Sequence, residues 1–414
     1  MKNIYFRKFI FLGFLFFAAS FYLAAQPGCP NIDAGPDQNL SCSTTCTDLM
    51  ANVFATGATT SYAVSSVPYS PPNAYNSGTP ILINIDDTWS SAINLPFTFC
   101  FFGNTYNQVI IGSNEILSFD LSGAGMFCPW SLISGSTIPT NTLPMNCIMG
   151  PYQDIDPTYQ GAIYWELIGN YPCRMLTVSY YQVPYYGDPN SISTASCPSP
   201  LYATSQIVLY ESTNVIEIYI QNKEVCTGWN NGYAIEGIQD ATGSNAYVVP
   251  GRNNGTVWTA SNDAWRFTPN GAPNYSISWW ENYVQIGSNA SVNVCPTATT
   301  TYTAQVIYDC CAGNQVVLTD DITVNVNNSI NLSISPPSGT ICGGGSVNLT
   351  ASCSDPSATY LWSTGSTNPT ISVNPVTTTT YTITATTTGC TTQTSAVVTV
   401  SSNPTVVVNS PSIC

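Results

Sequence analysis

The sequence predicts an all-β protein on three observations. No stretch beyond residue 25 repeats apolar residues at the helical spacing of i, i+3, i+4 and i+7. Short runs of β-branched and aromatic residues alternate instead with Gly, Pro, Asn and Ser, as strands alternate with turns. Two stretches of strict alternation, residues 321–326 and 396–400, are typical of strands with one buried face. Since 44% of the 414 residues are apolar, we expect about two to four domains with real cores.

The expected strands of the large domain follow one another at short intervals. They cover residues 81–85, 97–102, 108–111, 176–181, 206–210, 215–220 and 233–238. Most of the 29 Gly and 29 Pro lie between such runs. This punctuation indicates a large β-sandwich-type domain.

Two stretches near the C-terminus repeat each other at an offset of 79 residues without a gap. Residues 294–311 and 373–390 share a Thr-Thr-Thr-Tyr-Thr segment and end in Cys311 and Cys390. Residues 410–414 resemble the opening of the second copy at 335–342. Tandem repeats of this kind build arrays, so we expect modules and the remainder of a longer polypeptide beyond residue 414.

Each repeated module carries the pattern of an immunoglobulin (Ig)-like sandwich. An early Trp (Trp279 or Trp280, then Trp362) precedes a Tyr in the penultimate strand region (Tyr302, then Tyr381). A final alternating strand follows in both copies. The tail is therefore expected to be a series of small Ig-like β-sandwiches.

Composition shifts along the chain suggest six segments. The turn-rich residues 269–273 separate an aromatic, charged region from a Thr/Val/Asn-rich one. The expected segments are a signal peptide (1–25), a Cys-rich lead-in strapped onto the next domain (26–50), a large β-domain (51–269), module one (270–328), module two (329–402) and the start of a truncated third module (403–414).

The N-terminus has the pattern of an export signal. Lys2, Arg7 and Lys8 precede an apolar run over residues 9–25 that ends in small residues. Cleavage is expected between Ala25 and Gln26, and a membrane anchor is the alternative for this run. No later segment is long and apolar enough to span a bilayer, so we expect no transmembrane segment after cleavage and an extracellular or outer-surface location.

The 16 Cys are expected to form disulfides, because exported proteins meet an oxidising compartment. The chain has no His, which disfavours zinc. A Cys342–Cys390 bridge would close a loop of about 50 residues and stabilise module two by about 3–4 kcal/mol. Cys311 matches Cys390 but lacks an early partner in its own module, so Cys295–Cys311 is the expected bridge there. Cys414 is expected to be unpaired.

The charge balance is strongly acidic. Beyond residue 25 the chain has four basic residues against 22 acids, a net charge of −18. Such a surface repels phosphate backbones and anionic lipids. Nucleic acid is therefore not an expected partner.

Asp154 and Asp156 form the best candidate site. Alternate residues of an extended segment point to one face, about 7 Å apart. Calcium prefers such carboxylate oxygens, and Asp86, Asp87 or Asp120 could add ligands if the fold brings them near. The alternative is that these carboxylates accept hydrogen bonds from loop amides before Pro157.

Aromatic residues suggest a second kind of site. Exposed tryptophans could form a glycan-binding platform, with core packing as the alternative for each; the candidates are Trp229, Trp258, Trp265, Trp279 and Trp280. The absence of His excludes Ser-His-Asp and Cys-His catalysis. A glycosidase needs only two carboxylates, but the spacing selects no pair. We therefore expect a protein that is not an enzyme.

Several motifs of the large domain resemble a known kind of protein. They lie at residues 99–106, 111–119, 152–157, 236–239 and 250–253. These segments resemble the N-terminal region of large secreted Bacteroidetes surface proteins of the gliding-motility-associated, type IX secretion (type B) kind. Their order is also similar to nidogen-like domains, and the tail modules resemble PKD/Ig-like repeats. The resemblance covers about residues 33–414 and implies export, surface display or release, and adhesion, with no catalytic residues to transfer.

The expected function is that of an exported, disulfide-stabilised, non-catalytic cell-surface or secreted protein. Its large domain would bind an extracellular ligand, a glycan or a surface protein, while displayed on an Ig-like stalk. A carbohydrate-binding component of polysaccharide capture is the alternative. A carboxylate-pair glycoside hydrolase is the lower alternative.

Overall fold

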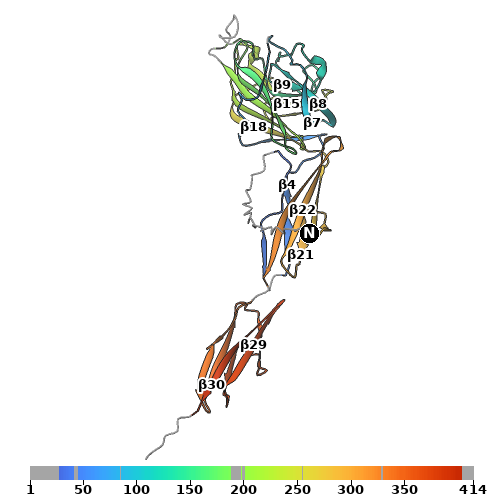
Figure 1. Cartoon of the computed structure of the whole chain (residues 1–414). Coiled ribbons are helices and arrows are strands. Elements are labelled where there is room, and N and C mark those ends of the chain that lie inside the picture. The colour runs from blue at the N-terminus through green and yellow to red at the C-terminus, as the bar shows by residue number, and fades with distance from the viewer. Residues whose placement is uncertain are drawn as a thin grey trace, which may run out of the picture.

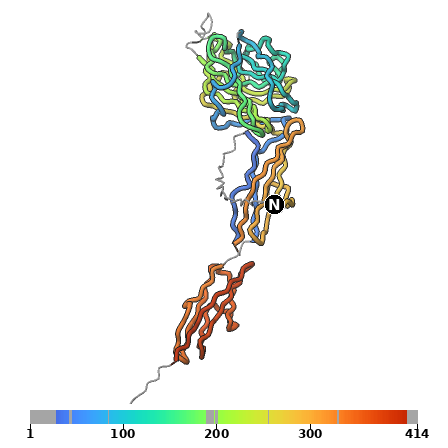
Figure 2. The backbone as a smooth tube through the Cα atoms, in the orientation of Figure 1, coloured from blue at the N-terminus to red at the C-terminus, as the bar shows by residue number. Residues whose placement is uncertain are grey.

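The computed structural model describes residues 28–41, 45–83, 85–187, 197, 201–253, 255–327 and 330–402. The signal cleavage site at Ala25 and Gln26, the third-module segment 403–414 and Cys414 lie outside the described residues. Within them, three bodies follow one another along an elongated molecule (Figures 1 and 2). We call them the head (residues 54–274), module 1 (residues 28–53 with 275–327) and module 2 (residues 330–402).

The prediction of an all-β fold is confirmed. The described residues form strands β1 to β30 and three short 3₁₀ helices, η1 (Leu121–Gly123), η2 (Asn230–Gly232) and η3 (Cys311–Gly313). No helix in this part of the chain is long and apolar enough to cross a membrane.

Two seven-stranded sheets make the head. One has the order β16-β15-β10-β9-β8-β7, with β17 also paired to β15; the other has the order β5-β18-β14-β13-β12-β11-β6. The strands of the first sheet are β7 (Ile93–Phe101), β8 (Asn104–Gly112), β9 (Ile116–Ser118), β10 (Cys147–Tyr152), β15 (Tyr233–Gln239), β16 (Ala246–Val248) and β17 (Thr256–Val257). Those of the second are β5 (Tyr62–Ser66), β6 (Thr79–Ile81), β11 (Ala162–Ile168), β12 (Met175–Pro184), β13 (Tyr202–Tyr210), β14 (Ile216–Lys223) and β18 (Ala260–Pro269).

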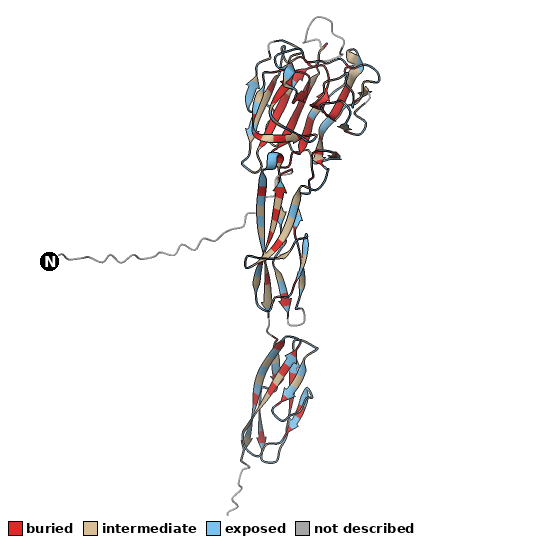
Figure 3. Cartoon of the chain, turned by 90° about the vertical axis from the view of Figure 1, so that its right-hand side faces the viewer, coloured by how far each residue is buried: buried red, intermediate tan, exposed pale blue. Residues whose placement is uncertain are grey.

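The main core of the head lies between these sheets (Figure 3). Alternate residues of β7, such as Phe99 and Phe101, are fully buried in the same cluster as Ile218 of β14. Burying each side chain of this size contributes about 1.5–3 kcal/mol. Glu217, which interrupts the apolar run of β14, is also buried and forms an ion pair with Arg266.

Module 1 is built from two stretches of chain on either side of the head. The later stretch supplies β19 (Tyr275–Glu281), β20 (Val284–Gly287), β21 (Ser291–Val294), β22 (Thr300–Asp309) and β23 (Gln315–Asn327). The earlier one supplies β1 (Ile32–Asp33), β2 (Gln38–Ser41), β3 (Thr47–Met50) and β4 (Asn52–Val53). Strand β2 pairs in parallel with β23, and β3 pairs antiparallel with β21.

The predicted lead-in is thus an integral part of module 1. Its Leu40 and Leu49 are buried in one core with Trp279 and Tyr302. The alternating burial of β2 and β3 requires a facing sheet, and the later stretch of module 1 provides it. The head is therefore inserted between the fourth and fifth strands of module 1.

Module 2 has the same plan in one continuous stretch. Its strands are β24 (Leu332–Ser335), β25 (Ser338–Cys342), β26 (Val347–Cys353), β27 (Thr359–Trp362), β28 (Thr370–Val373), β29 (Thr379–Thr387) and β30 (Cys390–Ser401). Strand β25 pairs in parallel with β30, as β2 does with β23. Trp279 lies opposite Ala304, and Trp362 lies opposite Ile383, 79 residues further on. The strand register thus matches the sequence repeat.

Four disulfides join described residues: Cys29–Cys173, Cys46–Cys295, Cys100–Cys311 and Cys197–Cys226. The predicted Cys295–Cys311 bridge is therefore wrong. Cys295 follows β21, whose partner strand β3 follows Cys46 directly. Cys311 lies at the β22–β23 turn and faces the head, where it meets Cys100 of β7.

The predicted Cys342–Cys390 bridge is also wrong. Cys342 pairs with Ser401 at the last residue of β30, whereas Cys390 is the first residue of that strand. Eleven residues of strand separate them by about 36 Å, and a disulfide joins Cα atoms less than about 7 Å apart. Cys342 is an exposed free thiol, and Cys390 is disulfide-bonded to another residue.

Candidate metal centre

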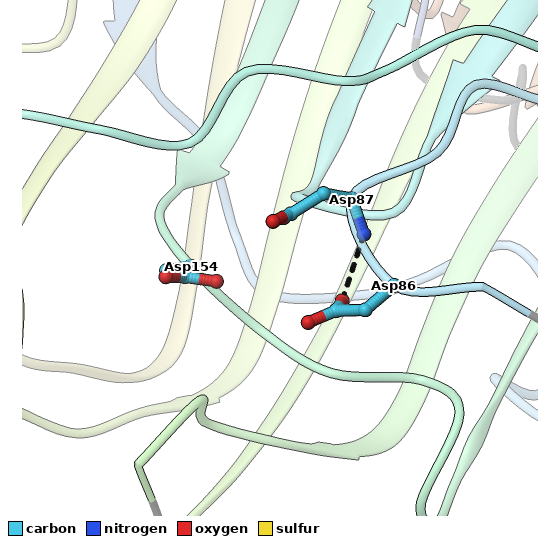
Figure 4. A group of neighbouring side chains, drawn as sticks. All are labelled: Asp86, Asp87 and Asp154. Atoms are coloured by element: carbon cyan, nitrogen blue, oxygen red, sulfur yellow. Dashed lines mark hydrogen bonds between the residues drawn. The ribbon is translucent and has the colours of Figure 1, made fainter.

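The candidate metal centre lies where two loops of the head meet. Asp86 and Asp87 belong to the connection between β6 and β7, and Asp154 follows β10. An isolated bridge between Ile155 and Tyr185 holds the second loop extended. One carboxylate oxygen from each of the three Asp residues lies within 4.8 Å of the other two (Figure 4).

This spacing fits one hard cation. Calcium binds oxygens at about 2.3–2.6 Å, so two ligands on opposite sides of one ion are about 4.8 Å apart. The carboxylates are also held in place by neighbours. The Asp87 amide donates to Asp86 Oδ1 (2.9 Å), Asn114 Nδ2 donates to Asp87 Oδ1 (3.0 Å), and Trp229 Nε1 donates to Asp154 Oδ2 (2.7 Å).

Two buried oxygens near this point have no hydrogen-bond partner. They are Oδ1 of Asp154 and Oδ2 of Asp156, on side chains that are 5% and 0% exposed. The other oxygen of Asp156 accepts from the Thr158 amide and hydroxyl. A buried carboxylate oxygen without a partner loses its hydration without compensation. The alternative of loop hydrogen bonding therefore explains one oxygen of each Asp and leaves the other for a further ligand.

Electrostatics make the same point. Burial, followed by the charges of Asp156 and Asp87, raises the pKa of Asp86 to about 7. Burial raises the pKa of Asp154 to about 8, against the Trp229 hydrogen bond and with the charges of Asp87 and Asp86. Burial and the Asp156 charge also raise the pKa of Asp87. A divalent cation would relieve this repulsion.

Aromatic side chains border the centre. The Trp229 ring lies 5.6 Å from Trp130 and 4.7 Å from Tyr186, measured between ring centroids. The cavity between Asp154, Tyr186 and Trp229 measures only about 10 Å³. That is the volume of about one water molecule in such a measure. The site has room for an ion, and a sugar ring does not fit beside Asp154.

The centre includes only some of the residues that the sequence suggested. Asp86 and Asp87 join Asp154, while Asp156 adds its charge and an unpartnered oxygen. Asp120 is exposed and caps η1 by accepting from the Ser122 amide, so it lies outside the centre. The supporting Asn114 was missed, because nothing in a Gly-Ser-Asn turn points to a carboxylate in a distant loop.

The predicted aromatic platform does not exist as one surface. Trp279 is buried in the core of module 1. Trp258 and Trp265 stack against Arg252 within the head, at 4.4 and 5.9 Å from ring centroid to guanidinium carbon. Trp229 borders the metal centre, and Trp280 lies on the outer face of module 1.

These features together define a class of protein. A β-sandwich head, Ig-like modules and four disulfides among the described residues are the make-up of a disulfide-stabilised extracellular protein. The family model of NIDO-related domains matches residues 61–278, which is 218 of the 414 residues. The chain belongs to the NIDO-related family. The match covers every strand of the head except none of its neighbours beyond β19.

Solved structures add only distant likenesses. Fibronectin(III)-like modules of Clostridium thermocellum CbhA are 14% identical, with a TM-score of 0.17, over 31% of this chain and 78% of theirs. The titin domains z1z2 in complex with telethonin are 16% identical, with a TM-score of 0.19, over 33% and 85%. The titin I-band fragment I67–I69 is 11% identical, with a TM-score of 0.18, over 32% and 57%. No curated protein matches the chain.

Proposed function

We propose that this protein is a non-catalytic extracellular binding protein whose head holds calcium and contacts a ligand. The head would be displayed on modules 1 and 2, and adhesion is the role that this arrangement serves best. The observation that carries the proposal is the convergence of Asp86, Asp87 and Asp154 around buried, unpartnered carboxylate oxygens.

The surface beside the metal centre supports ligand contact. Ile85 and Phe127 are 71% and 63% exposed. They flank the acidic loop, because Thr88 pairs with Phe127 and the Cys128 amide donates to the Asp87 carbonyl. Exposed apolar side chains grouped at one place mark an interaction surface more often than scattered ones do. Calcium would order this loop and so fix the positions of both side chains.

Calorimetry with the full chain tests the calcium step. After treatment with a chelator, we expect one calcium ion to bind and to raise the melting temperature of the head. Saturation at a hundred times Kd corresponds to about 2.7 kcal/mol. Asp154→Asn should weaken binding at least about tenfold, since it removes one charged ligand.

Asp120→Asn is the matched control. Asp120 is an exposed N-cap, and Asn caps equally well, so calcium binding should stay as in the wild type. Equal melting curves with and without calcium would show that the acidic loops hold no ion. Magnesium in place of calcium checks whether the site selects the larger cation.

Two other functions rank lower. Carbohydrate capture is favoured by an observation outside the head, the groove of module 1 described below. A glycoside hydrolase is disfavoured, because the cavity beside Asp154 is too small for a sugar ring. The origin in Bacteroidetes and export by type IX secretion stay part of the proposal, supported by the motif resemblance.

A further inference from the structure

The outer face of module 1 contains a groove that the metal centre does not involve. It measures about 560 Å³, within the range of small-ligand sites. Its floor is formed by Thr301, Thr303 and Gln305 of β22, which point away from the core. Trp280 of β19 lies directly opposite Thr303, and Tyr283 stands at the edge.

Tyr283 occupies an unfavourable backbone position. Asn282 and Tyr283 form the turn between β19 and β20 with φ of 47° and 66°. Tight hairpins with two positive φ values prefer Asn followed by Gly, and a bulky residue there is a conformational outlier. Tyr283 is also 99% exposed, so no packing within the described chain explains it. Such an outlier is best explained by a function of the side chain.

Module 2 provides an internal comparison. The Ser363 amide donates to the Thr382 carbonyl, so Ser363 stands where Trp280 pairs with Thr303, 79 residues earlier. The turn that follows has Gly365 at φ 83°. Module 2 therefore keeps the hydroxyl-rich sheet face but has Ser and Gly at the turn. The aromatic pair is a feature of module 1 and is not required by the Ig-like fold.

We infer that this groove binds a neutral oligosaccharide. Its lining side chains are Trp, Tyr, Thr, Asn and Gln, without an ionised group, although the chain as a whole is strongly acidic. Hydroxyls and amides can donate to and accept from sugar hydroxyls, while aromatic faces accept the C–H face of a sugar ring. An anionic glycan would meet Asp321, which accepts from Thr303 Oγ1 at 2.6 Å, so neutral sugars fit best.

The test measures binding of soluble neutral oligosaccharides to the full chain. The panel contains glucose-, mannose-, xylose-, galactose- and N-acetylglucosamine-based oligomers, with alginate oligomers as the anionic comparison. We expect at least one neutral series to bind and to change tryptophan fluorescence. Trp280→Ala and Tyr283→Gly should each weaken binding at least about tenfold, whereas Tyr159→Ala, at an exposed tyrosine of the head, should not.

Tyr283→Gly separates binding from folding. Gly adopts a positive φ without strain, so this variant should melt at the wild-type temperature or above it while losing the sugar. A chelator and Asp154→Asn should leave sugar binding unchanged, so this inference and the calcium proposal can fail separately. The inference is overturned if no neutral oligosaccharide of the panel binds, if Tyr283→Gly binds like the wild type, or if the face instead joins two copies of the chain.

Discussion

Modules 1 and 2 share one strand plan but differ in how the chain reaches it. Module 2 is made from the continuous residues 330–402, whereas module 1 is completed by strands that come before and after the head. The head consequently connects to module 1 at two points of the backbone, and Cys29–Cys173 and Cys100–Cys311 add two covalent links. Module 2 follows module 1 through the chain after β23. The difference teaches that a module can anchor a large domain firmly when that domain is inserted within it.

Removing the earlier stretch of module 1 should have the largest effect. A chain without residues 28–53 loses β1 to β4 and the buried Leu40 and Leu49. Each lost core leucine costs about 2–5 kcal/mol, and a whole domain is stable by only about 5–15 kcal/mol. Limited proteolysis should then cleave residues 275–327. A chain without residues 330–402 is the control and should keep the wild-type melting of the head and module 1.

The disulfides should separate the modules next. Cys46–Cys295 closes a sequence separation of 249 residues, so Cys46→Ser with Cys295→Ser should destabilise module 1 by about 3–5 kcal/mol. Cys342→Ser should change the stability of module 2 by less than about 0.5 kcal/mol, because this thiol is exposed and free. Scanning calorimetry measures both. Alkylation of Cys342 without prior reduction gives a direct check, and resistance to alkylation would contradict its free state.

The smallest effect should be a pH dependence confined to the head. Burial raises the pKa of Asp86, Glu115 and Glu236 to about 7 and that of Asp154 to about 8. A raised folded-state pKa stabilises below the ordinary carboxyl pKa and loses that effect as the pH rises through the raised value. Without calcium, the melting temperature of the head should therefore fall by several degrees from pH 5 to 8.

Calcium should reverse this trend, since it binds the deprotonated carboxylates. Burial lowers the pKa of Lys223 to about 8, which adds an opposite contribution at higher pH and sets the upper limit of the window. Module 2 should melt at nearly one temperature from pH 5 to 8. A head that melts equally at both pH values without calcium would contradict the burial of these acids.

Local patterns predicted the strands well, because alternation and turn residues act over a few positions. The alternating residues 321–326 lie in β23, and the repeat at 294–311 and 373–390 covers equivalent strands of both modules. The pairing of β2 with β23 could not be predicted in the same way. Its partners lie more than 280 residues apart, and nothing in a four-residue strand specifies its neighbour.

The candidate site was predicted in part for a similar reason. The alternation of Asp154 and Asp156 is a local signal, so the sequence was sufficient to single them out. That Asp86 and Asp87 approach them depends on how the loops of two facing sheets meet. The disulfide predictions failed because they assumed that each module is stapled within itself, while Cys311 in fact reaches the head.

The Cys100–Cys311 bond has a mechanical consequence. Cys311 precedes β23, and β23 ends at Asn327, next to module 2. A force that pulls the head away from module 2 therefore runs through the disulfide and along a strand that is already extended. The hydrogen bonds of module 1 lie beside this load path and are not in it. As long as the bond is intact, module 1 should lengthen little under tension, and reducing agents should make it extensible.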